Sequence, residues 1–203
     1  MKLFDGGAAP NPRRVRIFLA EKGIEIPLEP VDMLKFGHKS DAVTILNPFQ
    51  RLPVLALDDG TGLSETVAIC RYFEELHPDP PLMGVNALDK ARVEMWQRRM
   101  EFNLLMPIAS VFRHTHPAMK EWEVPQIAEV AESNRPRVIK MLDWMNDELA
   151  DREFIAGENY TIADITGLIS IDFMKPSRLN IPEGMDNLMR WYQMVKERPS
   201  AKA

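Results

Sequence analysis

The 203-residue chain is predicted to fold as a two-domain α+β protein, a mixed four-stranded sheet with helices followed by an all-helical domain. Short strand-like apolar runs occur only before residue 77, whereas beyond residue 85 the apolar residues recur at helical spacing. Between these regions the sequence HPDPP at 77–81 interrupts both patterns. We therefore predict domains at 1–77 and 86–203, joined by a linker at 78–85.

The first elements are predicted in the order strand, helix, strand. Met1–Phe4 is a short apolar strand, and residues 24–29 alternate as an edge strand does. Pro12 suits the first position of the helix between them, and Gly23 suits its end. Two strands joined by such a crossover are parallel. Residues 31–46 are expected to be irregular, with about one helical turn.

The next elements lie in the stretch 46–73, LNPFQRLPVLALDDGTGLSETVAICRYF. Residues 54–57 form an apolar strand, and the turn sequence at 58–62 folds it back as a hairpin. An amphipathic helix follows at once. The order βαβ and then ββα is that of a thioredoxin-like domain, and its antiparallel hairpin makes the sheet mixed.

Only helices are expected in the second domain. Their ranges are 86–114 with a bend near Pro107, 126–150 with a kink at Pro136, 161–173 and 185–198. The third is so apolar that it should be central. Thr161 and Asp164 form a capping box at its start, which is a folding device rather than a catalytic pair.

Composition excludes several classes of partner. The net charge is −5 and no basic run of five residues occurs, so nucleic acid is not an expected partner. A single cysteine, Cys70, is typical of a reducing cytoplasm and cannot form an internal disulfide. The N-terminus lacks the apolar core of a signal peptide, and no apolar run is long enough for a membrane span. We expect a cytoplasmic protein without a membrane partner.

A candidate peptide-binding edge lies around Pro53, which has no N–H and must stand at a strand start, an edge or a bulge. The backbone of Leu52 is then available to pair with the main chain of a ligand. A cis Leu52–Pro53 bond would give this geometry, although only about 5–6% of such bonds are cis. The next helix start attracts an anion, while Glu65 offers an acceptor and Thr66 a donor. Alternatively, these residues only cap the helix.

NPFQRLPVL followed by LSETVAICRYF resembles the glutathione-binding half of the cytosolic glutathione transferases, with features of bacterial theta and Nu classes. VRIFLAEKGI at 15–24 and NYTIADI at 159–165 extend the resemblance over nearly the whole chain. The resemblance implies a cis proline at Pro53, a main-chain contact at Leu52 and a grip on the γ-glutamyl group by Glu65 and Thr66. It also implies that three further residues lie near the glycyl carboxylate of glutathione: His38, Gln50 and Arg51.

The family's usual activating hydroxyl is missing. A transferase must stabilise the glutathione thiolate, because the thiolate is the nucleophile. No Ser, Thr, Tyr or Cys precedes Ser40; Ala9 falls at the family's serine position, and Phe4 falls on or near its tyrosine position. Ala9-Pro10-Asn11 resembles the Thr-Pro-Asn of the Nu class, so Asn11 becomes the candidate catalytic residue. Alternatively, Asn11 only caps the first helix before Pro12.

Asn11 and the N-terminus of the first helix can together lower the pKa of the glutathione thiol. One unit of pKa depression requires about 1.4 kcal/mol. A hydrogen bond to a charged group contributes roughly 1.5–3 kcal/mol, and a helix N-terminus roughly 0.3–1 kcal/mol, or about 2 when partly buried. Their sum supports a depression of about one to two units.

The electrophile pocket is assigned by the same resemblance to one face of the long helix. Arg98, Phe102, Leu105 and Met106 share a face by their i, i+3, i+4 spacing, and Arg113 follows further along. An interdomain core or a dimer interface is the alternative. His114 and His116 do not predict a metal site, because side chains two residues apart on a helix diverge.

The expected protein is thus a glutathione transferase that joins glutathione thiolate to small hydrophobic electrophiles. Glutathione is its co-substrate, a hydrophobic small molecule its second substrate, and no metal is expected. The resemblance implies a homodimer. One alternative is a Nu-type glutathione-dependent disulfide reductase or peroxidase. The other is a non-catalytic protein that binds glutathione or another ligand.

Overall fold

The computed structural model describes all 203 residues and divides the chain into two compact units. Unit 1 consists of residues 1–82 together with 199–203, and unit 2 consists of residues 83–198. The last five residues therefore pack with the N-terminal unit, although the sequence assigned them to the helical domain.

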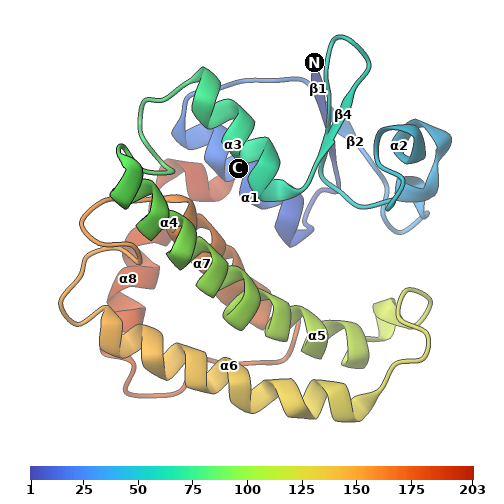
Figure 1. Ribbon diagram of the computed structural model, residues 1–203. Helices are drawn as coiled ribbons and strands as arrows, with labels where there is room; N and C mark the ends of the chain where they lie inside the picture. The colour runs from blue at the N-terminus through green and yellow to red at the C-terminus, as the bar shows by residue number, and fades with distance from the viewer. The chain divides into compact units, whose positions relative to one another are not determined.

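A mixed four-stranded sheet forms the centre of unit 1, in the strand order β2-β1-β3-β4 (Figure 1). The strands are β1 Lys2–Asp5, β2 Leu28–Pro30, β3 Val54–Ala56 and β4 Gly62–Ser64. β1 pairs with β2 in parallel and with β3 antiparallel, and β3 pairs with β4 antiparallel. The predicted sheet, its parallel first pair and its hairpin are confirmed. The edge strand is shorter than predicted and lies later, because it begins at Leu28 rather than at residue 24.

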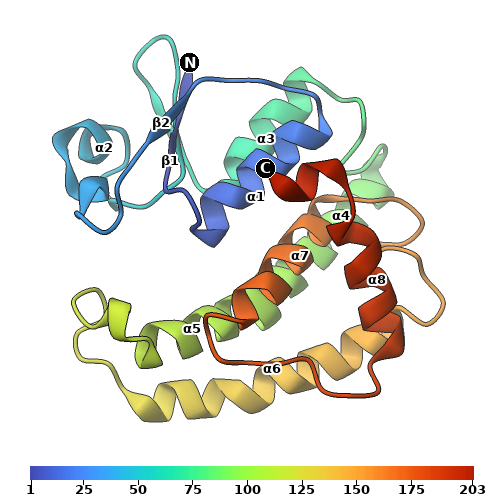
Figure 2. The ribbon, with the colours of Figure 1, turned by 180° about the vertical axis from the view of Figure 1, so that it is seen from behind.

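Helices cover both faces of this sheet. They are α1 Pro10–Glu21, α2 Asp41–Leu46 and α3 Thr66–Leu76, with short 3₁₀ turns at Gly37–Lys39 and Pro199–Lys202. Figures 1 and 2 show α1 and α3 together on one side of the sheet and α2 on the other. Pro10 rather than Pro12 takes the first helical position of α1. Gly23, at φ +63°, follows its end as predicted.

A buried ion pair ties α1 to α3 inside unit 1. Lys22 Nζ lies 2.7 Å from a carboxylate oxygen of Glu74, and both side chains are almost fully buried. The same ammonium donates to the carbonyl oxygens of His77 and Pro80, both at 2.6 Å. Three acceptors therefore share one cation where α1, α3 and the loop after α3 meet.

Unit 2 is helical, as predicted. Its elements are α4 Ala87–Met100, a π turn Glu101–Leu105, α5 Met106–Thr115, a 3₁₀ turn Pro117–Met119, α6 Ala128–Glu148, α7 Ile162–Met174 and α8 Asp186–Lys196. The predicted bend of the long helix takes the form of the π turn, which ends two residues before Pro107. α6 continues through Pro136. No helix has the length and apolarity needed to cross a membrane.

α7 is the central helix of unit 2, and eleven of its thirteen residues are buried. The predicted capping box is present: the Thr161 hydroxyl accepts from Ala163 N at 3.3 Å, and Asp164 Oδ2 accepts from Thr161 N at 2.9 Å. A Cβ atom on Gly167 would lie 2.6 Å from Ile155 Cδ1 and 2.8 Å from the ring of Trp191. Glycine at 167 therefore allows the tight packing around α7.

Candidate functional site

The direction of the strands brings three predicted site segments to one edge of the sheet in unit 1. β1 runs parallel to β2 and antiparallel to β3, so it runs in the same direction as β4. α1 begins after β1 and α3 begins after β4, while Leu52 and Pro53 precede β3. All three segments therefore meet at this edge. A Cβ atom on Gly6 would lie 3.3 Å from Leu52 Cδ1 and 3.4 Å from Pro12 Cγ.

The main chain at Leu52 is open. The Leu52–Pro53 bond is cis, and neither the N–H nor the C=O of Leu52 is hydrogen-bonded within the chain. The Leu52 side chain packs with Phe4 and Val54 in the core. This arrangement leaves the main chain at Leu52, just before β3, available to another strand-like chain.

Buried Asn47 braces the turn that leads into this segment. Its Nδ2 donates to the carbonyl of Arg51 at 2.9 Å, and its Oδ1 accepts from Phe49 N at 3.1 Å. The sequence reading did not single out Asn47. The signal was present in the Asn-Pro pair, because asparagine readily hydrogen-bonds the backbone two residues on.

Glu65 does not cap α3. It has φ +70° and ψ 119°, a region that non-glycine residues rarely adopt, and its exposed side chain makes no hydrogen bond to the helix start. Thr66, the first residue of α3, is buried. Strained backbone of this kind gathers at binding and catalytic sites. The structure therefore does not support the alternative that Glu65 only caps the helix.

In the first turn of α1, a single residue has a backbone N–H that is free to bind a ligand. Ala9 occupies the N-cap position without a side-chain cap. Pro10 and Pro12 have no N–H, and the N–H of Arg13 donates to Ala9 O at 3.3 Å. Only the backbone N–H of Asn11 therefore remains open in the first turn.

Asn11 is exposed and lies inside the helix, so it cannot be its N-cap. Its Oδ1 accepts from Arg14 Nη1 at 3.1 Å, which orients the side chain. The Nδ2 group is left as a second free donor. Asp5 supports the loop before α1, because its carboxylate pairs with Arg16 and accepts from Gly7 N at 3.2 Å.

The three residues expected near the glycyl carboxylate of glutathione differ in burial and in charge. His38 is buried on the Gly37–Lys39 turn, and burial lowers its pKa, with Lys39 and Arg51 adding to the effect. The imidazole is therefore mainly neutral at pH 7. Gln50 turns its Nε2 to the Thr44 hydroxyl at 3.2 Å. Exposed Arg51 is the cation of the group.

The five residues expected in the electrophile pocket do not form one surface in unit 2. Phe102 and Met106 are 57% and 53% exposed, but Leu105 is 5% exposed and belongs to the core. The π turn explains this difference, since it changes the register on which the i, i+3, i+4 prediction depends. The remaining two residues, Arg98 and Arg113, are held in ion pairs.

Those ion pairs are local. Arg98 lies 2.7 Å from Glu94 and 3.8 Å from Glu101. Arg113 lies 2.6 Å from Glu123, in the connection between α5 and α6. His114 and His116 support the same connection, each accepting a backbone N–H at Nδ1. No group of three or more His, Cys, Asp or Glu side chains comes together.

Comparison with known proteins identifies the family. The pattern described as "Glutathione S-transferase, N-terminal domain" matches residues 8–76, and "Glutathione S-transferase, C-terminal domain" matches residues 102–199. "Glutathione S-transferase 2" of Saccharomyces cerevisiae is 33% identical, over 100% of this chain and 88% of its own length. The chain belongs to the glutathione S-transferase family.

Solved structures of glutathione S-transferases agree with this assignment. The crystal structure of Gtt2 from Saccharomyces cerevisiae has a TM-score of 0.94 at 33% identity and covers 100% of this chain and 99% of its own. A glutathione S-transferase domain-containing protein of Marinobacter aquaeolei VT8 also has a TM-score of 0.94 at 33% identity, with coverage of 98% and 99%. The glutathione S-transferase fold thus extends over both units of the chain.

One full-length relative has a different name. "Stringent starvation protein A homolog" of Coxiella burnetii is 26% identical, over 100% of this chain and 90% of its own length. The N-terminal glutathione S-transferase match includes every candidate position at the sheet edge from Asn11 to Thr66. The C-terminal match begins at residue 102 and so leaves out Arg98.

Proposed function

We propose that this chain binds glutathione at the sheet edge of unit 1 and transfers its thiolate to small hydrophobic electrophiles. One observation carries the proposal: two helices without side-chain caps begin at the edge where the Leu52 backbone is open. Glutathione has an α-amino-acid end, a cysteinyl main chain with a thiol, and a terminal carboxylate. Each of these groups has a matching partner among the residues at this edge.

The charge and hydrogen-bonding capacity of each glutathione group indicate which residues at the edge bind it. The first-turn N–H groups of α3 and the Thr66 hydroxyl suit the γ-glutamyl carboxylate, and the Glu65 carboxylate suits the ammonium. The cysteinyl main chain pairs with the backbone of Leu52 as an added strand. Arg51 and neutral His38 serve the glycyl carboxylate. Gln50 can also bind this carboxylate once its side chain rotates away from the Thr44 hydroxyl.

The thiolate is stabilised by Asn11, through its backbone N–H and its Nδ2 group. Two hydrogen bonds to a charged sulfur, at roughly 1.5–3 kcal/mol each, lower the thiol pKa by about two to four units. The thiol proton leaves to water. The sulfur then forms a bond to an electron-poor carbon, and a chloroarene expels chloride as the leaving group.

Two substitutions separate the donors of Asn11. Asn11→Ala removes the side-chain donor, and Asn11→Pro removes the backbone N–H as well, at a first-turn position that tolerates proline. We expect the pKa of bound glutathione, measured from thiolate ultraviolet absorbance, to rise by about one unit in the first variant and further in the second. The conjugation rate of a chloronitroarene at neutral pH should fall in the same order. Melting temperatures verify the fold of each variant.

Glu65→Gln is the matched control, because it should weaken glutathione binding without changing the pKa of the bound thiol. Equal thiol pKa values in wild type and both Asn11 variants would refute the role of Asn11. Failure of the wild type to bind glutathione in calorimetry would refute the whole proposal.

A non-catalytic glutathione-binding protein is the second candidate. It is favoured by Ala9 at the N-cap, which supplies no hydroxyl, and by the full-length relative that is not named a transferase. Glutathione binding without conjugation, and without reduction of a small disulfide by glutathione, would establish this candidate. Disulfide reduction without conjugation would instead identify the reductase alternative.

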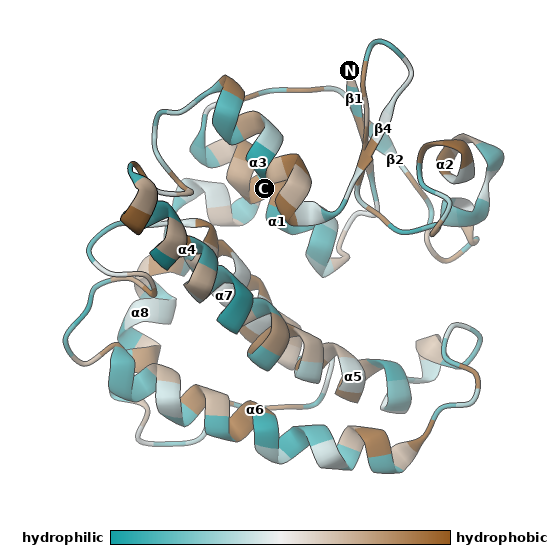
Figure 3. Cartoon of the chain, viewed as in Figure 1, coloured by the Kyte–Doolittle hydropathy of each residue, from teal (hydrophilic) through white to brown (hydrophobic).

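We also propose that the chain forms a homodimer through an apolar stripe on the long helix of unit 2. The stripe consists of Leu88, Met95, Phe102 and Met106, which are 60%, 40%, 57% and 53% exposed. Figure 3 shows hydrophobic positions recurring along the α4–α5 ribbon between hydrophilic ones. Exposed apolar residues gathered in this way are typical of an association surface.

A further inference from the structure

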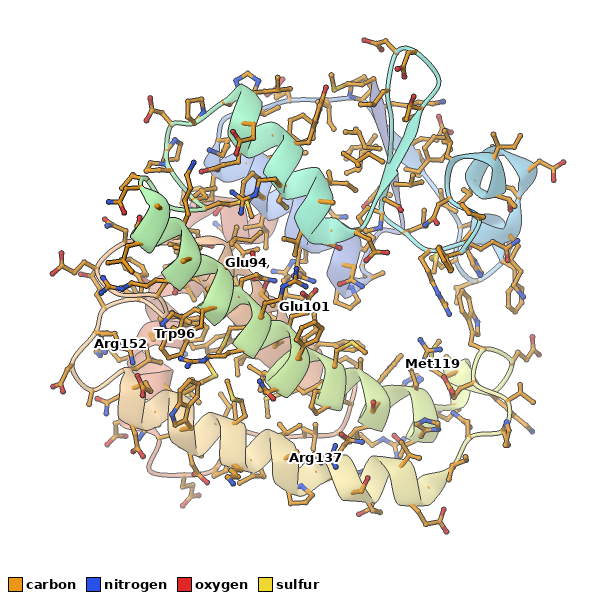
Figure 4. The ribbon with its side chains drawn as sticks, in the orientation of Figure 1. Glu94, Trp96, Glu101, Met119, Arg137 and Arg152 are labelled. Carbon is orange, nitrogen blue, oxygen red and sulfur yellow. The ribbon has the colours of Figure 1, made fainter.

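Arg14 is a buried arginine on α1, the helix that also carries the candidate catalytic residue Asn11. It is only 2% exposed and is among the largest fully buried side chains of the protein. Arginine is seldom buried so completely. By comparison, Arg98, which pairs with Glu94 and Glu101 (both labelled in Figure 4), has 50% of its side chain exposed. The burial of a cation so close to Asn11 indicates a role at the site.

The guanidinium of Arg14 reaches back along α1 to the side chain of Asn11. Helix side chains lean toward the N-terminus, and residues at i and i+3 share a face. Arg14 Nη1 donates to Asn11 Oδ1 at 3.1 Å. A guanidinium has N–H donors and no acceptor, so it can bind only the oxygen of the Asn11 amide. The Nδ2 group therefore points away from Arg14.

The orientation of this amide decides whether Asn11 favours or opposes a thiolate. An asparagine amide can turn over and exchange the places of its oxygen and its nitrogen. With Nδ2 toward the ligand it donates to the sulfur, but with Oδ1 there it places a partial negative charge against a negative sulfur. Turning the amide over would break the bond to Arg14, and charge-assisted bonds are about twice as strong as neutral ones. Arg14 thus selects the donating orientation before glutathione binds.

The positive charge of Arg14 acts in the same direction. A cation near a helix N-terminus is unfavourable for the helix itself, but it is favourable for an anion bound there. A hydrogen bond from a charged donor also polarises the Asn11 amide, which strengthens the bond that Nδ2 donates in turn. Both effects favour the thiolate over the thiol.

We propose that Arg14 is a positioning residue for the activation of glutathione, because it holds the Asn11 amide with Nδ2 toward the sulfur. This role rests on the proposed function, since it requires glutathione to bind with its sulfur beside Asn11. A hydroxyl rotates freely to donate a hydrogen bond, whereas an amide must be held in one of its two orientations. A site that has Ala9 in place of a hydroxyl residue therefore needs a second residue to orient its donor.

The test is a double-mutant cycle that measures the pKa of bound glutathione from thiolate ultraviolet absorbance. Arg14→Gln replaces the donor-only guanidinium by an amide that can hold Asn11 in either orientation. The thiol pKa should rise by about 0.3 to 1 unit, from the twofold cost of an unselected orientation up to the loss of the Asn11 donor. In the Asn11→Ala background the same substitution should change the pKa by less than about 0.2 unit, because the coupled partner is gone.

Two further variants separate orientation from charge and from folding. Arg14→Lys retains a donor-only cation, so its thiol pKa should lie nearer to the wild type than that of Arg14→Gln. Arg13→Gln is the matched control, because Arg13 Nη2 donates to Ala201 O at 2.7 Å and not to Asn11. It should leave the thiol pKa unchanged. If melting temperatures show that Arg14→Gln does not fold, Arg14→Met takes its place in the cycle.

Equal shifts of the thiol pKa in both backgrounds would overturn the role of Arg14, because the residue would then act through its charge or the fold and not through Asn11. An unchanged pKa in Arg14→Gln would overturn it as well, and would leave the role of Asn11 intact. An unchanged pKa in Asn11→Ala is a separate failure: it would refute the proposed activation by Asn11, and the role of Arg14 with it.

Discussion

At the scale of single residues, two prolines determine what the start of α1 offers to a ligand. A helix normally presents several free N–H groups at its N-terminus. Pro10 and Pro12 remove two of them, and Arg13 donates to Ala9, so Asn11 holds the open donors. Without a hydroxyl at position 9, the proposed activation of glutathione depends on this one residue.

Lys22 gives a stability prediction at the same scale. Lys22→Met would remove the cation beside the buried Glu74 carboxylate and the donor to two carbonyl oxygens. Removing one partner of a buried pair costs about 3–5 kcal/mol, so the free energy of unfolding in urea should fall by that amount. The double variant Lys22→Met, Glu74→Leu should recover most of the loss. A loss below about 1 kcal/mol in the single variant would show that the pair is not structurally important.

Glu65 gives a prediction in which stability and binding move in opposite directions. Its φ of +70° is unfavourable for glutamate and acceptable for glycine. Glu65→Gly should therefore raise the free energy of unfolding by about 1 kcal/mol, while glutathione binding in calorimetry weakens. Glu65→Gln retains the strain and should weaken binding without the gain in stability. Tighter glutathione binding by the glycine variant would contradict the assigned role.

At the scale of elements, the capping box of α7 is also a buried acid. Asp164 accepts hydrogen bonds from Ile155 N and Trp191 Nε1 at one oxygen and from Thr161 at the other. Burial nevertheless raises the pKa of Asp164 to about 6, from an ordinary value of 3.8. Between these pH values the folded protein holds a proton that the unfolded chain has lost. This group therefore stabilises the fold less as the pH rises.

The prediction compares the wild type with Asp164→Asn, whose residue 164 does not titrate. The stability difference between them, measured by urea unfolding, should fall by about 2 to 2.5 kcal/mol as the pH rises from about 4 to about 7. The comparison cancels the titration of the other acidic groups. A difference that grows with pH would mean that the hydrogen bonds outweigh burial and that the pKa is lowered.

The long helix shows which features of an element can be predicted. Its extent from residue 86 to 114 follows from local apolar spacing, and the bend follows from Pro107. The π turn at 101–105 does not follow, because an extra residue in one turn leaves no mark in composition. Leu105 therefore turns into the core although spacing predicted it beside Phe102.

At the scale of the whole molecule, the dimer proposal predicts that charged substitutions in the apolar stripe lower the molecular mass in solution. Leu88→Glu with Met95→Glu adds two charges to the apolar stripe and should convert a dimer into a monomer in sedimentation velocity. Leu34→Glu is the control, because Leu34 is 88% exposed and lies outside the stripe. It should leave the dimer intact. A monomeric wild type at micromolar concentration would refute the dimer proposal.

The sequence by itself determined the elements of each unit, the mixed sheet and the family resemblance. These rest on periodicity, turn residues and caps, which act between residues close together in the chain. It also predicted that Leu52, Pro53, Glu65 and Thr66 contact glutathione, because these residues lie within one short stretch of the chain.

Only the tertiary structure decided which distant groups meet. The shared direction of β1 and β4 brings the starts of α1 and α3 to one edge. Packing of α6 against the long helix creates a hollow between residues 102–107 and 137–144, which lie about one-third of unit 2 apart in the chain. The backbone conformation of Glu65 and the burial of Leu105 arise in the same way. Each depends on long-range contacts, which leave no periodic signal in the sequence.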